Sequence, residues 1–238
     1  MTLPADTGER ILLEKESPLM IARHLSAYVF ASGLIRQKDV LDIGCGEGYG
    51  SFYLAGHARK ACGIDYNDQV ISYAQGKYRK DNLSFRVLDV RRLAELGEKF
   101  SAVCSFQFIE HLREPAAFLD DVKSLLSPGG IFLCSTCNKH DSSPGSAVPC
   151  NKFHLREYDL PEFTGLLQSR FTGVEMWGLH RKAKLKFYLR LKKSGVCNIL
   201  PAGIDPVKKF FGRMDTQNFE FSKQRLGSAL DFLAVCRT

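Results

Sequence analysis

Three glycines and an acidic residue about 20 positions further on give this chain its best candidate for binding a nucleoside-like ligand. Gly44, Gly46 and Gly48 follow the apolar run Val40–Ile43, and Asp65 ends a second apolar run at 61–65. Glycines allow a tight turn with positive φ and a close approach of the backbone to a ligand. An acid at this distance is where nucleotide-binding folds hold ribose hydroxyls. The spacing therefore predicts a pocket for a ligand that carries a ribose.

The same stretch argues against two common phosphate sites. Glycines recur at every second residue through 44–50, whereas a dinucleotide fingerprint needs G-x-G-x-x-G and a P-loop needs a lysine after its last glycine. Asp42 precedes the turn, and a carboxylate aimed at the pocket would attract a cation and repel a pyrophosphate. The pattern favours a positively charged nucleoside.

The composition indicates an ordinary globular chain. It has 238 residues, of which 45% are hydrophobic and 25% charged, so one full α/β domain with a sizeable core is expected. We find no apolar run of about 18 residues, which argues against a membrane span. The N-terminus lacks the basic and apolar regions of a signal peptide. Together these features predict a cytoplasmic protein.

The eight cysteines do not form a disulfide pattern. Cys45 lies in the glycine turn, and expected strands contain Cys62, Cys104, Cys134 and Cys236. Small buried cysteines of this kind suit a reducing compartment. Cys134 and Cys137 have C-x-x-C spacing, with Cys150 and His154 downstream, but no second pair at zinc-site spacing follows. We therefore expect no metal.

Apolar runs and helical patterns alternate along the first two thirds of the chain. We expect helices over 18–34, 49–57, 67–79, 115–126 and 159–170, and strands over 38–43, 60–64, 83–88, 100–106, 130–135, 171–177 and 228–236. Ser17, Asn67 and Asp159 are suitable helix N-caps. Alternation of this kind predicts a parallel sheet joined by right-handed crossovers.

The net charge of +7 is concentrated late in the chain. Residues 181–213 contain ten Lys or Arg residues and one acid, Asp205. Within them, 184–193 interleave basic residues with Leu, Phe and Tyr. Such a segment could rest on an anionic membrane surface, contact nucleic-acid phosphates, or form a solvated face over a local apolar patch. The sequence leaves these three alternatives open.

Five stretches together resemble class I S-adenosylmethionine-dependent methyltransferases, in particular the type 11/12-like subset. They occur in the family's order and spacing, at 40–48, 63–66, 85–90, 105–112 and 126–130. The resemblance implies an α/β Rossmann-like fold: a seven-stranded, mostly parallel sheet with helices on both faces. It also implies a single domain over 1–238, with an N-terminal arm and helix at 1–36. A basic insertion or lid at 180–226 would precede an antiparallel last strand.

The resemblance also implies a cofactor, S-adenosyl-L-methionine, and assigns residues to its parts. The amino-acid portion would lie against Gly44, Cys45 and Gly46, near Asp42. The ribose would be held by Asp65 beside Tyr66, and the adenine would lie near Asp89 and Val90. Phe106 and Gln107 would line the region of the reactive methyl group. If they do not bind the cofactor, Asp65 and Asp89 could instead be acids that cap the following helices.

Two histidines are candidates for a catalytic base. His154 lies in the segment Asn151–Tyr158, which resembles an N-P-x-H-x-R-E-(F/Y) motif of some family members, with Glu157 placed to orient it. His111 follows Glu110 in a family motif that faces the acceptor pocket. Either histidine could instead only satisfy backbone groups. Residues 8–14 resemble a family leader that folds over the cofactor, although a frayed surface arm is the alternative.

The expected function is methyl transfer from S-adenosylmethionine to a hydroxyl group of a small molecule or sugar. Assembly of a cell-surface glycan or a lipid-linked precursor is the expected setting, with peripheral contact of 181–213 with an anionic membrane. RNA methylation is the alternative that the basic segment suggests. A non-catalytic scaffold that binds the cofactor is a third alternative, although the glycine turn, Asp65 and Asp89 are all present.

Overall fold

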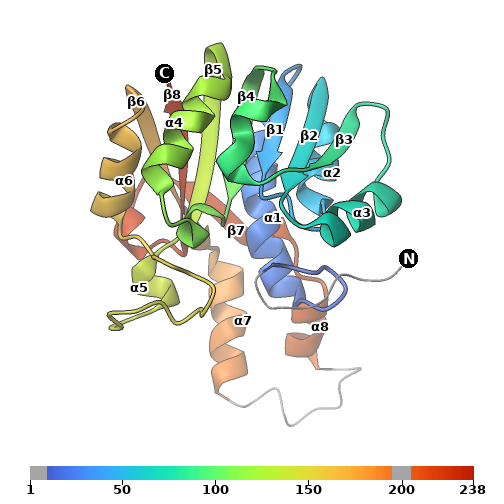
Figure 1. The fold of residues 1–238 in the computed structure, drawn as a ribbon. Helices are drawn as coiled ribbons and strands as arrows, with labels where there is room; N and C mark the ends of the chain where they lie inside the picture. Colours follow the sequence, from blue (N-terminus) through green and yellow to red (C-terminus); the bar gives the residue numbers. More distant parts are fainter. Residues whose placement is uncertain (1–9, 195–204) are drawn as a thin grey trace.

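The computed structural model describes residues 10–194 and 205–238, which form one mixed sheet covered by helices (Figure 1). The strands lie in the order β3-β2-β1-β4-β5-β8-β6-β7. Their bounds are β1 Asp39–Ile43, β2 Lys60–Asp65, β3 Leu83–Val87, β4 Phe100–Phe106, β5 Leu126–Cys137, β6 Gly173–Arg181, β7 Phe219–Ser222 and β8 Asp231–Arg237.

The α-helices are α1 Pro18–Ser32, α2 Tyr49–Ala55, α3 Asp68–Lys77, α4 Pro115–Leu125, α5 Lys139–Ser142, α6 Leu160–Gln168, α7 Ala183–Lys193 and α8 Pro206–Gly212. Short 3-10 helices are η1 Val90–Leu96, η2 Ile109–His111, η4 Thr216–Asn218 and η5 Leu226–Ser228. The expected caps are confirmed: the side chains of Ser17, Asn67 and Asp159 each accept a backbone N–H in the first turn of their helix.

Strands β1 to β5 form a parallel half whose apolar residues alternate between two cores. In β1, Leu41 and Ile43 pack on one face with residues of α4 and α6. Val40 packs on the other face with residues of α1 and α2, including Tyr28 and Leu54. Helices cover both faces, which is why these strands read as continuous apolar runs. The fold class is confirmed.

The sheet has eight strands, one more than expected. The additional strand, β7, lies inside the basic insertion and pairs antiparallel with β6. Its four residues are too few to show a periodic pattern, so the sequence gives little signal for it. The last strand, β8, is antiparallel as expected and lies between β5 and β6.

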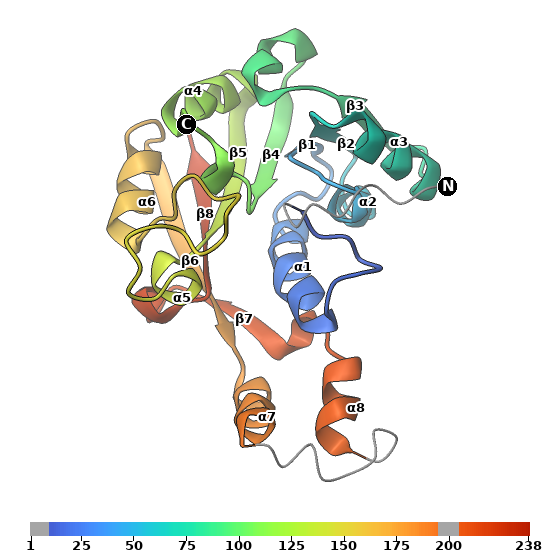
Figure 2. The same cartoon turned by 60° about the horizontal axis from the view of Figure 1, so that its bottom comes forward.

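Helices α7 and α8 project from the end of the sheet at which the parallel strands finish (Figures 1 and 2). A separate apolar cluster holds them there, with Leu185 and Phe210 packed near Ala22 of α1. No helix within the described ranges combines the length and the apolar character needed to cross a membrane. All seven cysteines in those ranges are free thiols; Cys197 lies outside them.

Candidate active site

Two adjoining cavities open at the carboxyl ends of β1, β2 and β4. Their volumes are about 550 and 630 Å³, and both are lined by Gly44, Asp65, Tyr66, Phe108 and His111. The first cavity extends toward α1 and α5, and the second toward η1 and α4. Every residue that the sequence assigned to the site lines one of them, except Asp42.

The loop at 44–48, here called the glycine loop, follows strand β1 and forms part of the wall of the first cavity. Gly44 and Gly46 have φ values of 74° and 54°. A Cβ atom on Gly44 would meet the Phe108 ring at 2.4 Å, whereas one on Gly46 would meet no atom within 4 Å. Gly44 and Cys45 donate their backbone N–H groups to the Ile64 carbonyl, at 2.9 Å each. The backbone at Gly46 therefore faces open space in a rigidly held turn.

Asp65 lies where the two cavities meet. One carboxylate oxygen accepts the Gly46 N–H at 3.1 Å, and the other accepts the Asn67 N–H at 3.0 Å. The side chain belongs to both cavity walls. A carboxylate fixed in this way can accept hydrogen bonds from two neighbouring hydroxyl groups, as a ribose presents them.

Asp42 is the one predicted site residue that the structure places elsewhere. It is buried beneath the glycine loop, and its Oδ2 accepts the Ser51 hydroxyl at 2.6 Å. Burial raises its pKa to about 7, against the hydrogen bonds from Ser51 and Tyr28. Because side chains alternate along a strand, Asp42 points toward α1 and α2 rather than past the strand end. It supports the loop and does not line either cavity.

The second cavity has an apolar floor and one acidic edge. Leu88, Val90 and Phe108 line it together with Asp89. Asp89 also caps η1, since its Oδ1 accepts the Arg91 N–H at 2.9 Å. Hydrogen bonds from Arg91 lower the pKa of Asp89 to about 2. A planar base could lie between these apolar walls with a polar atom toward the acid. The residues present therefore fit an adenosine-like group, with Phe106 and Gln107 beyond it in the first cavity.

The N-terminal leader folds over the first cavity. Arg10 and Leu12 line that cavity. The Arg10 guanidinium lies 5.9 Å from the centre of the Tyr66 ring, and the Leu13 N–H donates to Glu47. Over the described residues of this leader, the frayed-arm alternative is therefore wrong. Gly8 and Glu9 lie outside the described residues.

His154 is held in one tautomer by hydrogen bonds at both ring nitrogens. Asn151 Oδ1 accepts the Phe153 N–H at 3.0 Å, so the Asn151 amide NH₂ must be the group that lies 3.0 Å from His154 Nε2. An NH₂ group can only donate, so Nε2 accepts and Nδ1 carries the proton. His154 Nδ1 then donates to Glu157 Oε1 at 2.7 Å. The basic nitrogen of this pair is Nε2.

Glu157 is well placed to stabilise a proton on the histidine. It is buried and part of the same cavity wall. Burial acts to raise its pKa, but hydrogen bonding with Ser143, His154 and Ser142 outweighs burial and leaves the pKa lowered. The carboxylate therefore stays charged beside the imidazole. A histidine oriented by a buried carboxylate has the arrangement of a general base.

The second histidine belongs to the same structural unit. His111 Nδ1 donates to the Phe153 carbonyl at 2.9 Å, and its ring meets the His154 ring edge-on with centres 5.0 Å apart. The Glu110 carbonyl accepts the N–H groups of Leu155 and Arg156. These bonds join the 3-10 helix η2 to the loop at 151–157, here called the histidine loop. Both predicted bases therefore lie in the same wall of the first cavity.

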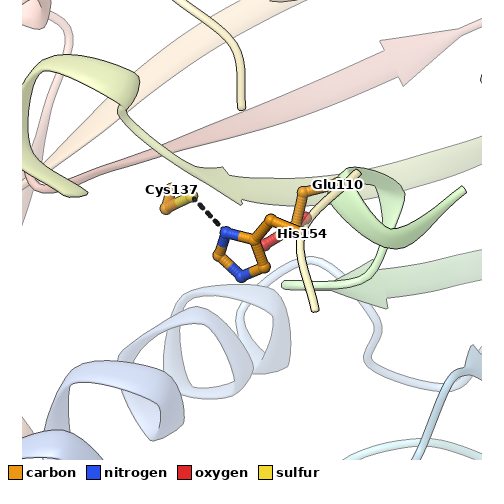
Figure 3. A group of neighbouring side chains, drawn as sticks. All are labelled: Glu110, Cys137 and His154. Atoms are coloured by element: carbon orange, nitrogen blue, oxygen red, sulfur yellow. Dashed lines mark hydrogen bonds between the residues drawn. The ribbon is translucent and has the colours of Figure 1, made fainter. Parts of the chain in front are cut away.

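Glu110, Cys137 and His154 could together hold a cation (Figure 3). Their ligand atoms lie within 4.8 Å of one another, and Cys137 Sγ lies 3.9 Å from His154 Nδ1. That nitrogen already donates to Glu157, so a metal would have to replace this bond. Cys134 packs in the apolar core instead. The C-x-x-C spacing therefore does not produce a paired metal half-site.

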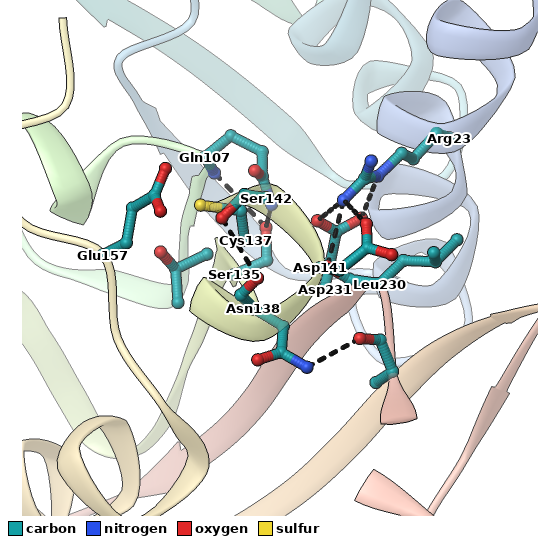
Figure 4. A network of polar contacts seen from close by, with 12 residues as sticks. Arg23, Gln107, Ser135, Cys137, Asn138, Asp141, Ser142, Glu157, Leu230 and Asp231 are labelled. Carbon is teal, nitrogen blue, oxygen red and sulfur yellow. Dashed lines mark hydrogen bonds and ion pairs between the residues drawn. The ribbon is translucent and has the colours of Figure 1, made fainter. Parts of the chain in front are cut away.

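One polar wall of the first cavity, built by α1 and α5 and supported from behind by β8, has no signal in the sequence (Figure 4). Arg23 donates from Nε and Nη2 to the two carboxylate oxygens of Asp231, at 2.8 and 2.7 Å. Asp141 lies 3.5 Å from Arg23, and His24 is its neighbour in the wall. These residues are up to 208 positions apart in the chain, so no local motif could reveal them.

Replacing Glu110 by glutamine should change how stability depends on pH. Burial raises the pKa of Glu110 to about 8, although backbone amides and Thr136 oppose this. The unfolded chain releases this proton near pH 4.3, at about the usual value for Glu, while the folded chain keeps it. The wild-type fold therefore loses stability as the pH rises between these values.

We expect the free energy of unfolding of Glu110→Gln, relative to wild type, to rise by a few kcal/mol between about pH 5 and pH 8. Urea denaturation at both pH values measures this difference. Subtraction removes the similar contribution of Asp42, which both proteins share. A difference that stays constant with pH would show that Glu110 is ionised in the folded protein.

Comparison with known proteins places this site in a family. Residues 35–176 match the model of a methyltransferase domain. A probable S-adenosylmethionine-dependent methyltransferase from Mycolicibacterium smegmatis is 37% identical over 176 residues, which cover 71% of this chain and 65% of the relative. A ubiquinone biosynthesis O-methyltransferase from Cereibacter sphaeroides is 33% identical, with 68% and 64% covered. The chain thus spans somewhat less than two thirds of the length of these relatives.

The fold also matches solved structures. A SAM-dependent methyltransferase from Archaeoglobus fulgidus superimposes with a TM-score of 0.60 at 17% identity, and the match covers 94% of this chain and 96% of that one. At this identity the similarity shows the fold alone.

Proposed function

Because the chain belongs to the class I S-adenosylmethionine-dependent methyltransferases, we propose that it transfers the methyl group to a hydroxyl acceptor. The observation that carries this proposal is the 2.7 Å hydrogen bond between His154 Nδ1 and Glu157 in the wall of the first cavity. An alcohol or phenol must lose a proton when it is methylated, and this pair provides a base for that proton. An amine or carbon acceptor has less need of one.

The cofactor would lie across both cavities, and the acceptor would bind in the first. The cofactor, when bound, supplies a methyl group on a positively charged sulfur, which is the electrophile of the reaction. Gly44, Cys45 and Gly46 would hold its amino-acid portion, Asp65 its ribose, and Val90 and Asp89 its base. The acceptor would then enter the remaining part of the first cavity, between the histidine loop and α1. Holding both partners in line supplies much of the rate enhancement.

The proton released by the acceptor hydroxyl would be taken up by His154, whose ring lies between Asn151 and Glu157. The acceptor hydroxyl would replace Asn151 Nδ2 as hydrogen-bond partner of His154 Nε2. As the acceptor oxygen bonds to the methyl carbon and the electron pair of the carbon–sulfur bond returns to sulfur, the hydroxyl proton would pass to Nε2, and Glu157 would stabilise the resulting imidazolium through Nδ1. His111, edge-on to His154, would position the hydroxyl.

One observation favours a hydroxyl-rich acceptor such as a sugar or a polyol. The acceptor side of the first cavity carries carboxylate and amide groups, including Glu16, Asp141 and Asn151, which accept or donate hydrogen bonds to hydroxyl groups. The name of the relative from Cereibacter sphaeroides, a ubiquinone biosynthesis O-methyltransferase, supports an oxygen acceptor but does not distinguish a sugar from another hydroxyl compound. The setting that we propose is the assembly of a surface glycan or of its lipid-linked precursor.

Incubation of the protein with S-adenosylmethionine carrying a labelled methyl group tests this proposal. The acceptor panel should contain sugars, phenols, amines and RNA. We expect label in an alkali-stable ether of a hydroxyl acceptor. Label only in amines or in RNA bases would reject a hydroxyl acceptor, and cofactor binding without transfer to any class would favour a scaffold.

A further inference from the structure

We propose that the outer face of α7, together with α8, docks on a membrane surface rich in anionic phospholipid. On a helix with about 3.6 residues per turn, Leu185, Tyr188 and Leu189 share one side of α7, and this side packs toward the protein. Phe187 lies on the opposite side with 57% of its surface exposed. Its ring contacts that of the neighbouring Tyr188, with centres 5.6 Å apart, but more than half of its surface stays open to solvent.

Basic residues surround Phe187 on this outer face. Lys186, Arg190 and Lys193 are exposed, as is Lys184, whose Nζ lies 5.5 Å from the centre of the Phe210 ring of α8. Among the residues that the structure describes, no carboxylate forms an ion pair with any of these four. Lys209 of α8 and Arg213 just after it add to this charge, whereas Lys208 lies 4.0 Å from the Asp205 carboxylate. Of the twelve residues between the helices, 194–205, the one acid is Asp205, which is buried and caps α8.

Aromatic and basic residues on one helical face match an interface between lipid headgroups and acyl chains. The aromatic ring inserts at the acyl boundary, while long basic side chains reach the phosphates. A duplex nucleic acid would attract the same charges but would not use a large aromatic side chain at the centre of the face; a single strand could stack a base on that ring, so RNA is included in the test. At 11 and 7 residues, α7 and α8 are too short to span a bilayer. The patch is therefore suited to peripheral contact.

Helix α1 connects this surface to the active site. Leu19 and Ala22 pack in the apolar cluster that holds α7 and α8, while Met20, Arg23 and His24 line the first cavity. Docking through α7 would thus bring the cavity close to the membrane surface, where a lipid-linked acceptor would be found. This last consequence depends on the proposed function; the docking itself does not.

Co-sedimentation with vesicles tests the docking, with phosphatidylcholine vesicles that contain or lack phosphatidylglycerol. We expect binding only to the anionic vesicles, and release when the salt rises from about 0.1 M to about 1 M. The variant Lys186→Gln/Arg190→Gln should bind about 25-fold more weakly, since each basic residue near the surface contributes about fivefold. Phe187→Ala should bind about tenfold more weakly.

A matched pair of exposed arginines elsewhere provides the control. Arg36→Gln/Arg79→Gln removes the same charge away from α7 and should leave vesicle binding unchanged. Methyl transfer to a soluble acceptor should be normal in all three variants. The vesicle test measures binding only, so its result does not depend on which acceptor the protein methylates. The proposal is overturned if anionic vesicles do not bind, or if the control pair loses as much affinity. It is also overturned if RNA binds more tightly than vesicles and Phe187→Ala has no effect.

Discussion

Replacing His154 by alanine is expected to lower the rate of methyl transfer by about 10²- to 10⁴-fold, the usual contribution of a general base. The variant removes the imidazole whose Nδ1 donates to Glu157 and whose Nε2 would take the acceptor's proton. Affinity for S-adenosylmethionine should be unchanged, because no predicted cofactor contact involves this ring. Single-turnover transfer from labelled cofactor measures the rate, and calorimetry measures the affinity.

Three further measurements separate a chemical role of His154 from a structural one. Added imidazole should restore part of the rate in His154→Ala, which a merely misfolded loop would not show. Glu157→Gln should lose less activity, because its amide oxygen can still accept the Nδ1 proton but carries no charge. His140→Ala, an exposed histidine on α5, should behave as wild type. Unchanged turnover in His154→Ala would exclude this residue as the base.

Replacing Asp65 by alanine is expected to weaken binding of S-adenosylmethionine by about 10²- to 10⁴-fold. Two hydrogen bonds from ribose hydroxyls to a charged acceptor would be lost, at about 1.5–3 kcal/mol each. The same substitution removes the acceptor of the Gly46 and Asn67 N–H groups, which loosens the glycine loop. Calorimetric titration of the variant measures the loss.

Two companion variants show whether the loss comes from the ribose contacts. Asp68→Ala removes an exposed acid three residues away and should bind the cofactor normally. Asp65→Asn keeps one accepting oxygen and should show an intermediate loss of affinity, with a slightly lower melting temperature because its NH₂ group would face one of the two backbone N–H groups. If Asp65→Ala bound the cofactor as tightly as wild type, the ribose would have to lie elsewhere.

Local patterns explain why much of the fold and cofactor side could be predicted from the sequence. The glycines at 44–48 mark a turn with positive φ, and Asp65 marks the end of a strand. Both features are set by neighbouring residues in the chain, so the sequence reveals them. The caps at Ser17, Asn67 and Asp159 follow from local hydrogen bonding. His154 and Glu157 are three residues apart in one segment, so the pair too could be seen in the sequence.

Features that depend on distant contacts could not be predicted. The direction of Asp42 depends on which face of β1 meets α1 and α2, and the sequence pattern does not reveal this. The wall of Arg23 and Asp141, with Asp231 behind it, forms only when α1, α5 and β8 meet. Strand β7 is too short for a periodic signal, and it forms because β6 offers it an edge.

Titration of the wild-type protein with S-adenosylmethionine and with its demethylated product, followed by calorimetry, tests the central claim most directly. The claim is that the glycine loop and Asp65 form a pocket for this nucleoside at the carboxyl ends of β1 and β2. We expect saturable binding of both compounds at one site per chain. Absence of binding to either compound at millimolar concentration would contradict it.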